Sequence, residues 1–252
     1  MFLTVLGEGL FKMAYRTDPR VAQPGLAVPA VDEGLRSFML SVYNYMGLGL
    51  AITGIVALVV ASTPALYVPI FTTPLKWVVI LAPLGFVFFL SARIGTMSAS
   101  AAQITFWLFA AVMGISMASI FLVFTGESIA RVFFVTAATF GAASLYGYTA
   151  KRDLTSMGSF LFMGLIGIVI ASLVNLFIGS TALQFAVSVI GVLVFTGLTA
   201  WDSQRLKGEY LGTYQYGGEL AAKGAVMGAL SLYLNFINLF TMLLQLMGNQ
   251  RN

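Results

Sequence analysis

The stretch from Ser37 to Leu75 contains no charged residue, and this feature restricts the fold more than any other. A membrane-spanning helix needs about 20 consecutive, mostly apolar residues, so the stretch is long enough for one span and the loop after it. Across the chain, 59% of the residues are hydrophobic and 9% are charged, whereas soluble domains carry about 25% charged residues. The sequence therefore predicts an integral membrane protein that lies in a lipid bilayer.

Seven apolar runs that are long enough to cross a membrane follow one another along the chain. The runs are continuously apolar, whereas strands of a membrane barrel alternate apolar and polar residues over about ten positions. Helices also satisfy every backbone group internally, as lipid requires. We therefore predict an all-α membrane protein, a seven-transmembrane-helix bundle. Its spans are predicted near 38–61, 76–93, 102–125, 131–149, 157–179, 182–204 and 224–247.

Proline, glycine and polar residues mark the segments between the runs. The segment that contains Pro64, Pro69 and Pro74 is predicted to be the outer loop after the first span. Gly179-Ser180-Thr181 is predicted to form a tight turn between the fifth and sixth spans. The longest polar segment between runs is 205–223, which we also predict to be a loop.

The first residues of the chain differ from the rest, because residues 1–36 are polar and contain three prolines. We predict a largely irregular N-terminal tail over 1–36 and a seven-helix transmembrane domain over 37–252. A cleaved signal peptide is not expected, since Glu8 interrupts the short apolar run at the start. Met13 is followed by an ordinary polar start, so whether Met1 or Met13 is the native initiator stays open.

The Lys and Arg residues indicate the orientation, because cytoplasmic loops of membrane proteins carry an excess of them. If the N-terminus is cytoplasmic, seven spans place Lys76, Arg131 and Arg251 outside and the other ten of the 13 Lys and Arg residues inside. The sequence therefore predicts a cytoplasmic N-terminus and an external C-terminus.

Small residues four positions apart let helix backbones approach closely in lipid, where no hydrophobic effect drives the helices together. Three such pairs predict close helix contacts, unless they only reflect how common Gly and Ala are in this chain. The pairs are Gly47 with Ala51, Ala137 with Gly141, and Gly167 with Ala171.

Missing residue types exclude several classes of function. The chain has no cysteine and no histidine, which excludes disulfides, zinc–thiolate sites, haem ligation by histidine and a Ser-His protease. An intramembrane aspartyl protease needs two buried aspartates, and Asp202 is the one candidate for such a position. The clusters of Lys and Arg are too small for a nucleic-acid surface. We therefore expect neither an enzyme nor a bound cofactor, and no nucleic acid as a partner.

Asp202 is the acidic residue best placed for buried chemistry, because it ends the apolar run of the sixth span. An ionisable group within a span costs about 2.5–3.5 kcal/mol on insertion scales, so such residues are functional candidates. Arg93, at the inner end of the second span, and Arg205 are its possible partners. In the alternative interpretation, Asp202 lies at the interface within reach of water and is capped by a neighbouring arginine. Arg93 would then be an anchor that extends to the membrane surface.

Polar side chains in the last span are the second set of candidates. Asn235 and Asn238 lie three residues apart and can share one face of a helix. Ser231 and Tyr233 lie in the same run. Buried amides commonly join helices by hydrogen bonds, so a structural role and a role in an ion path both remain open for the two asparagines.

Four stretches of the chain resemble the Bax inhibitor-1 family, in its bacterial YccA-like branch. The likeness begins near Gly34 and continues to the C-terminus, so it covers nearly everything except the tail. The stretches are 144–154 (SLYGYTAKRDL), 158–167 (GSFLFMGLIG), 198–205 (LTAWDSQR) and 229–240 (ALSLYLNFINLF).

The resemblance implies a compact seven-helix fold around a central, rather short seventh helix, in the bacterial cytoplasmic (inner) membrane. It also implies a pH-sensitive calcium leak. In relatives described in this way, two aspartates on helices six and seven form the sensor, and an arginine on helix two closes the pore. Asp202 matches the first aspartate, Asn235 stands at the position of the second, and Arg93 is an approximate match to the arginine.

The asparagine changes what the site can do. Two close carboxylates can share a proton, whereas an aspartate beside an asparagine cannot, and Asn235 can instead donate a hydrogen bond to an ionised Asp202. One carboxylate is also a weaker calcium site than two, because charge and oxygen ligands set the affinity. With Asp202 as the candidate metal ligand, we expect weaker calcium selectivity or a shifted pH response.

Two hypotheses of function follow from these residues. In the first, the protein is a passive ion leak for calcium or another cation, gated around Asp202, Asn235 and Arg93, with Arg205 and Asn238 as secondary polar candidates. In the second, it does not transport ions and regulates other membrane machinery, such as a membrane-bound AAA protease. The N-terminal tail and the 205–223 segment would then be the contact surfaces. The oligomeric state stays open in both.

Overall fold

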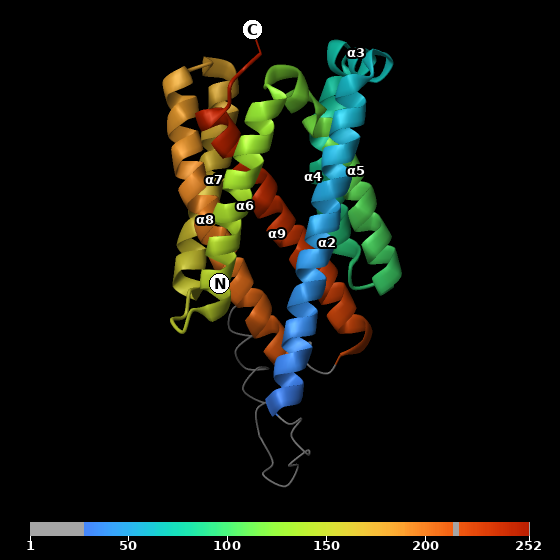
Figure 1. The fold of residues 1–252 in the computed structure, drawn as a ribbon, viewed down its shortest axis with the longest axis vertical. Coiled ribbons are helices and arrows are strands. Elements are labelled where there is room, and N and C mark those ends of the chain that lie inside the picture. Colours follow the sequence, from blue (N-terminus) through green and yellow to red (C-terminus); the bar gives the residue numbers. More distant parts are fainter. Residues whose placement is uncertain (1–27, 214–216, 252) are drawn as a thin grey trace, which may run out of the picture.

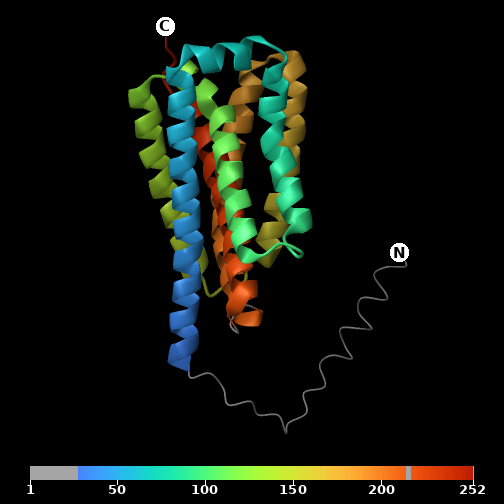
Figure 2. The same cartoon turned by 90° about the vertical axis from the view of Figure 1, so that its right-hand side faces the viewer.

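The computed structural model describes residues 28–213 and 217–251 (Figures 1 and 2). Seven of the helices in this part of the chain are long and apolar enough to cross a membrane, which leaves α3 as a short exception. The predicted all-α bundle with seven spans is therefore confirmed. The helices are α2 (Val28–Ser62), α3 (Pro64–Thr72), α4 (Leu75–Arg93), α5 (Ala99–Val123), α6 (Gly126–Thr149), α7 (Thr155–Ile178), α8 (Thr181–Gly212) and α9 (Gly218–Met247).

Helix α9 runs obliquely through the centre of the bundle, and the other long helices surround it (Figure 1). It packs against α2, α5, α6 and α8. Its fully buried side chains include Leu232, Tyr233 and Leu239. The expected central position of the last span is thus confirmed. Its 30 residues make it longer than the resemblance implies, because an oblique path through the bundle needs more helix.

The outer surface of the bundle is apolar over most of its height. Phe88, Phe134 and Phe177 are each more than two-thirds exposed. Exposed apolar patches of this kind mark surfaces that contact another phase or partner. On helices of this length, that surface fits the acyl chains of a bilayer.

The ends of several helices follow directly from the sequence. Ser98, Thr125 and Ser180 precede α5, α6 and α8, and each hydroxyl oxygen accepts a hydrogen bond from a backbone N–H three residues later. Such caps satisfy N–H groups that a helix leaves unpaired at its start. Gly179 has a φ of 66°, a left-handed conformation that glycine adopts at little cost. The predicted tight turn between α7 and α8 is therefore confirmed.

Three segments that were predicted to be loops or an irregular tail contain helix. Residues 64–72 form α3, which lies across one end of the bundle (Figure 2). Pro64 occupies its first turn, where the missing N–H group is not needed. In the 205–223 segment, α8 continues to Gly212 and α9 begins at Gly218. In the predicted tail, the chain is helical from Val28 onward, whereas Met1, Met13 and the rest of residues 1–27 lie outside the described residues.

The predicted small-residue contacts were wrong, because a Cβ atom placed on Gly47, Gly141 or Gly167 would meet nothing within 4 Å. Close helix contacts occur at other glycines. A Cβ atom on Gly114 of α5 would lie 2.7 Å from the backbone oxygen of Thr53 on α2. One on Gly147 of α6 would overlap the backbone of Ala200 on α8. Spacing alone does not show which face of a helix meets a neighbour.

The residues after α9 are fixed to the turn between α5 and α6. The backbone N–H of Thr125 donates to the oxygen of Asn249 at 3.0 Å, and the N–H of Arg251 donates to the oxygen of Val123 at 2.8 Å. Phe124 and Gln250 form an antiparallel bridge between these bonds. The central helix is thereby held at its C-terminal end.

Candidate functional site

Asp202 lies on α8 where this helix packs against α9, and it is 3% exposed. Helical spacing places Arg205 on the same face of α8, because residues three positions apart are neighbours on a helix surface. The structure therefore buries Asp202, and the neighbouring Arg205 pairs with it, as the alternative interpretation expects.

Two residues of α9 hold one oxygen of the Asp202 carboxylate. Ser231 Oγ donates to Oδ2 at 2.8 Å and Asn235 Nδ2 donates to the same atom at 2.7 Å. The second oxygen, Oδ1, lies 2.8 Å from Nη2 of Arg205 in an ion pair. We call Asp202, Arg205, Ser231 and Asn235 the polar cluster. A buried carboxylate is tolerated only when charges and hydrogen bonds compensate its lost hydration, and the polar cluster supplies both.

Arg205 links the buried carboxylate to the end of the bundle. Its Nη2 donates to Ser231 Oγ at 3.4 Å, and its Nε lies 3.5 Å from Oε1 of Glu209. The guanidinium also lies over the indole ring of Trp201, 4.9 Å from the ring centre. Such cation–π contacts contribute about 0.5–2 kcal/mol, depending on solvation. Several independent contacts therefore fix the position of this arginine.

The indole of Trp201 rests against Gly158 on α7. A Cβ atom on Gly158 would overlap the indole ring, so only glycine leaves room for the tryptophan at this place. Trp201 therefore lies between α7 and α8, beside the polar cluster.

Two cavities meet at Trp201 and Arg205. The larger cavity, of about 650 Å³, is lined by α4, α7, α8 and α9 and includes Asp202 and Asn235. The end cavity, of about 450 Å³, is lined by the α6–α7 connection, including Lys151 and Asp153, and by α8. Trp201 and Arg205 belong to both linings. The stacked pair therefore separates a space within the bundle from a space at its end.

Asp153 carries a negative charge at the end cavity. The side chain and the backbone N–H of Thr155 donate to its Oδ1 at 2.6 and 2.9 Å. These hydrogen bonds favour the charged carboxylate and lower the pKa of Asp153 below its ordinary value. The carboxylate is therefore ionised at neutral pH.

The candidate residues are distributed unequally around Asp202. Asn235 and Arg205 contact it directly, as described above. Asn238 lines the larger cavity, but its amide donates to the backbone oxygen of Leu234 at 2.8 Å. Arg93 is the exposed last residue of α4, and among the described residues it forms no ion pair with Asp202. The arginine beside the aspartate is thus Arg205 in this conformation, because it lies one helical turn away on the same helix.

The donor set bears on metal binding. Within residues 28–213 and 217–251, no three Asp or Glu residues gather into a group that could hold a metal ion. Both oxygens of Asp202 already face Arg205, Ser231 or Asn235. A cation could bind Asp202 only after Arg205 moves away from it.

A chain of hydroxyl groups beside the polar cluster was not anticipated from the sequence. Tyr43 Oη lies 2.6 Å from Ser144 Oγ, which lies 2.8 Å from Ser203 Oγ. Ser203 follows Asp202 and donates to the backbone oxygen of Thr199. Serine in a helix commonly bonds to its own backbone in this way, so the residue types alone gave no signal. The chain joins α2, α6 and α8 near the site.

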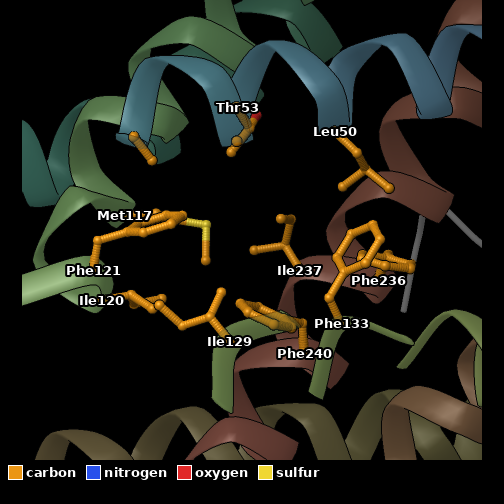
Figure 3. A pocket seen from close by; sticks show the side chains of 12 residues that line it. Leu50, Thr53, Met117, Ile120, Phe121, Ile129, Phe133, Phe236, Ile237 and Phe240 are labelled. Atoms are coloured by element: carbon orange, nitrogen blue, oxygen red, sulfur yellow. The ribbon is translucent and has the colours of Figure 1, made fainter. Parts of the chain in front are cut away.

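An apolar cavity of about 90 Å³ lies between α2, α5, α6 and α9, and Figure 3 shows the side chains around it. Thr53 is the one polar side chain in its lining, and its Oγ1 donates to the backbone oxygen of Ala110 at 2.8 Å. The hydroxyl of Tyr233, 2.6 Å away, must therefore donate to Thr53. Since this lining carries no charge, a cation would find no counter-charge here.

Comparison with known proteins agrees with this architecture. A family model described as "Inhibitor of apoptosis-promoting Bax1" matches residues 35–252. The chain belongs to the Bax inhibitor-1 family. The resemblance of the four sequence stretches is thereby confirmed.

Several bacterial proteins are similar to this Bax inhibitor-1 family member over most of their length. Inner membrane protein YbhL of Escherichia coli (strain K12) is 48% identical over 221 residues, which cover 86% of this chain and 94% of YbhL. Proteins of Rickettsia prowazekii and Caulobacter vibrioides are 49% and 46% identical, over 88% of this chain and 93% and 92% of theirs. The family and these relatives support an integral membrane protein.

Proposed function

We propose that this Bax inhibitor-1 family member is a passive leak for cations such as calcium, gated around Asp202. One observation carries the proposal. The larger cavity and the end cavity meet at Trp201 and Arg205, directly beside a buried carboxylate. Ionisable residues within a membrane are rare and mark functional sites such as ion pathways.

In the present conformation the path is closed. Arg205 lies between the two cavities, and its positive charge neutralises Asp202. Opening requires the guanidinium to leave the carboxylate. Asp202 would then offer a negative charge, and Ser231 and the amide oxygen of Asn235 would offer neutral oxygen ligands, which suit a hard cation such as calcium.

The polar cluster also bears on ion selectivity. A single carboxylate beside an amide attracts a divalent ion less strongly than two carboxylates do. The proposal therefore includes weak discrimination between calcium and monovalent cations. It also includes little change of flux near neutral pH, because Asp202 and Asn235 cannot share a proton.

The proposed orientation places the end cavity in the cytoplasm. This follows from the excess of Lys and Arg in the segments at that end, as the positive-inside rule requires. In the bacterial inner membrane, Asp153 and Lys151 would then lie at the cytoplasmic mouth of the path.

Flux into proteoliposomes tests the proposal. We expect calcium and potassium to enter vesicles that contain the wild-type protein, and Asp202→Asn to reduce this flux at least tenfold. Glu127→Gln is the matched control, because Glu127 forms an exposed pair with Arg131 away from the cavities. Flux that Asp202→Asn leaves unchanged would remove Asp202 from the path. No wild-type flux at any pH would contradict the leak and favour the non-transporting regulator.

A further inference from the structure

The larger cavity is open on the side that faces the membrane. Helix α4 packs mainly against α5, and α7 packs mainly against α8, so α4 and α7 face each other across the opening. Leu84 of α4 and Phe162, Leu173 and Leu176 of α7 line the cavity and are each more than half exposed. The cavity therefore has three walls of protein and a fourth side that the described chain leaves uncovered.

The chemistry of the opening favours hydrocarbon over water. The side chains at the rim are aliphatic and aromatic, and they belong to membrane-spanning helices. Apolar surfaces of this kind favour apolar occupants, and the polar side chains of the lining lie at its α8–α9 wall. The volume of about 650 Å³ lies within the range of about 300–1,000 Å³ that is typical of sites for organic ligands.

The polar end of the cavity does not oppose an apolar occupant. Asp202 is neutralised by Arg205, and Ser231 and Asn235 donate to the carboxylate. The polar cluster therefore presents few free hydrogen-bonding groups to the cavity. Trp201 lines the same cavity.

We propose that an acyl chain of a bilayer phospholipid enters between α4 and α7, fills the larger cavity and contacts Trp201. The occupant is part of the solvent that surrounds seven membrane spans, so it is present at high concentration at the opening. The acyl chain closes the open side of the cavity and separates the polar cluster from the lipid around the bundle. This site belongs to the closed conformation, in which Arg205 pairs with Asp202, and its test does not require that the protein conducts ions.

Tryptophan fluorescence tests the site, because lipids with brominated acyl chains quench a tryptophan that they touch. The chain has three tryptophans, and the double variant Trp77→Phe/Trp107→Phe leaves Trp201 as the single emitter. We expect vesicles of brominated phosphatidylcholine to reduce its emission by at least half relative to vesicles of unbrominated lipid. An aqueous quencher such as iodide should have less than a third of this effect.

Two cavity-filling substitutions distinguish quenching by an acyl chain in the cavity from quenching by lipid around the bundle. Val87→Phe and Ser172→Phe, from the α4 and α7 walls, should each lower the quenching of Trp201 at least twofold. Val78→Phe is the control, since Val78 is exposed on α4 and does not line the cavity. Equal quenching in filled and unfilled proteins would overturn the proposal. Stronger quenching by iodide would indicate a water-filled cavity, and quenching that disappears at high protein-to-lipid ratio would indicate a second copy of the chain.

A measurement on the unmodified protein covers the case in which the filled variants do not fold. Phosphatidylcholine with a photoreactive group on its acyl chain should label peptides of α8 around Trp201 in addition to the outer faces of α4 and α7. Labelling confined to outward residues such as Phe88 and Phe177 would contradict the site.

Discussion

Two neutral donors and one cation from neighbouring helical turns stabilise the buried charge of Asp202. Ser231 and Asn235 bind one oxygen, and Arg205 pairs with the other. A buried carboxylate that loses its cation is destabilised more than one that loses a neutral donor. The arginine is therefore the residue on which the stability of the polar cluster depends most, and in the proposed function it also closes the path.

Arg205→Gln should lower stability and raise leak. Removing one partner of a buried ion pair costs about 3–5 kcal/mol, and we expect the lower end of this range because the Arg205 side chain is 35% exposed. In the double variant Asp202→Asn/Arg205→Gln no charge is left unpaired, so most of the loss should be recovered. Thermal unfolding in detergent measures the cycle. Additive effects of the two single changes would show that the pair is not coupled.

Asn235→Asp should give the site a pH dependence that we do not expect of the wild-type protein. The new carboxylate would lie within hydrogen-bonding distance of Asp202, where the present amide donates at 2.7 Å. Two carboxylates so close hold one shared proton. Cation flux in proteoliposomes should therefore change severalfold between pH 5 and pH 8, as titration of the pair requires.

Asn238→Asp is the matched control for this change, since the amide of Asn238 bonds to Leu234 on its own helix and not to Asp202. It adds the same carboxylate to the same cavity. A pH response of equal size in the two variants would mean that contact with Asp202 is not what creates it.

At the scale of helices, close contacts at single glycines hold neighbouring elements together. Gly147 lets α6 approach the backbone of Ala200 on α8, and this contact lies two residues from Asp202. Backbone cannot rotate away as a side chain can, so any added atom must separate the two helices. The position of α8, and with it that of the polar cluster, depends on this glycine.

Gly147→Ala and Gly141→Ala should have opposite effects on stability. The new Cβ overlaps backbone at Gly147 and meets open space at Gly141. We expect a loss of about 1–3 kcal/mol at Gly147 from overpacking, and a gain of up to about 1 kcal/mol at Gly141 because alanine favours helix over glycine. Both glycines lie on α6, so the unfolding temperatures of the two variants can be compared directly. A stable Gly147→Ala protein would refute the close contact.

The sequence was sufficient to predict the membrane spans, but it did not show which faces of the helices contact one another. Continuous apolar runs predict seven helices, because lipid imposes their length and composition. α3 was missed because Pro69 lies inside it, whereas a proline within a helix removes a backbone hydrogen bond and usually indicates a break. The glycine contacts were misplaced because spacing does not show which face of α6 or α5 meets another helix.

The site was predicted in part for the same reason. Asp202 is visible as an acidic residue in an apolar run, and the resemblance places Asn235 beside it. Arg205 lies one turn from Asp202 in sequence, so their contact could be anticipated from helical spacing. The shared wall of Trp201 and Arg205 depends on Gly158 of another helix, and no local pattern shows that long-range contact.

At the scale of the molecule, seven spans place the two ends of the described chain at opposite ends of the bundle (Figure 1). A reporter fused after Asn252 should therefore be active only outside the cytoplasm, because Lys and Arg residues favour a cytoplasmic N-terminus. Alkaline phosphatase, which folds outside, and a fluorescent protein that matures inside give opposite readouts. A cytoplasmic C-terminus would overturn the orientation or the number of spans.

Residues 249–251 are anchored to the α5–α6 turn, so any tilt of the central helix would turn about this fixed end, the pivot. Asn235 lies 12 residues before the end of α9 at Met247, about 18 Å from the pivot at 1.5 Å per residue. A tilt of about 5° would shift it by about 1.5 Å, which is enough to break its hydrogen bond to Asp202. The opposite end begins at Gly218, and Gly217 and Gly218 both have positive φ. The same tilt would displace this end more than Asn235, because it lies farther from the anchored residues.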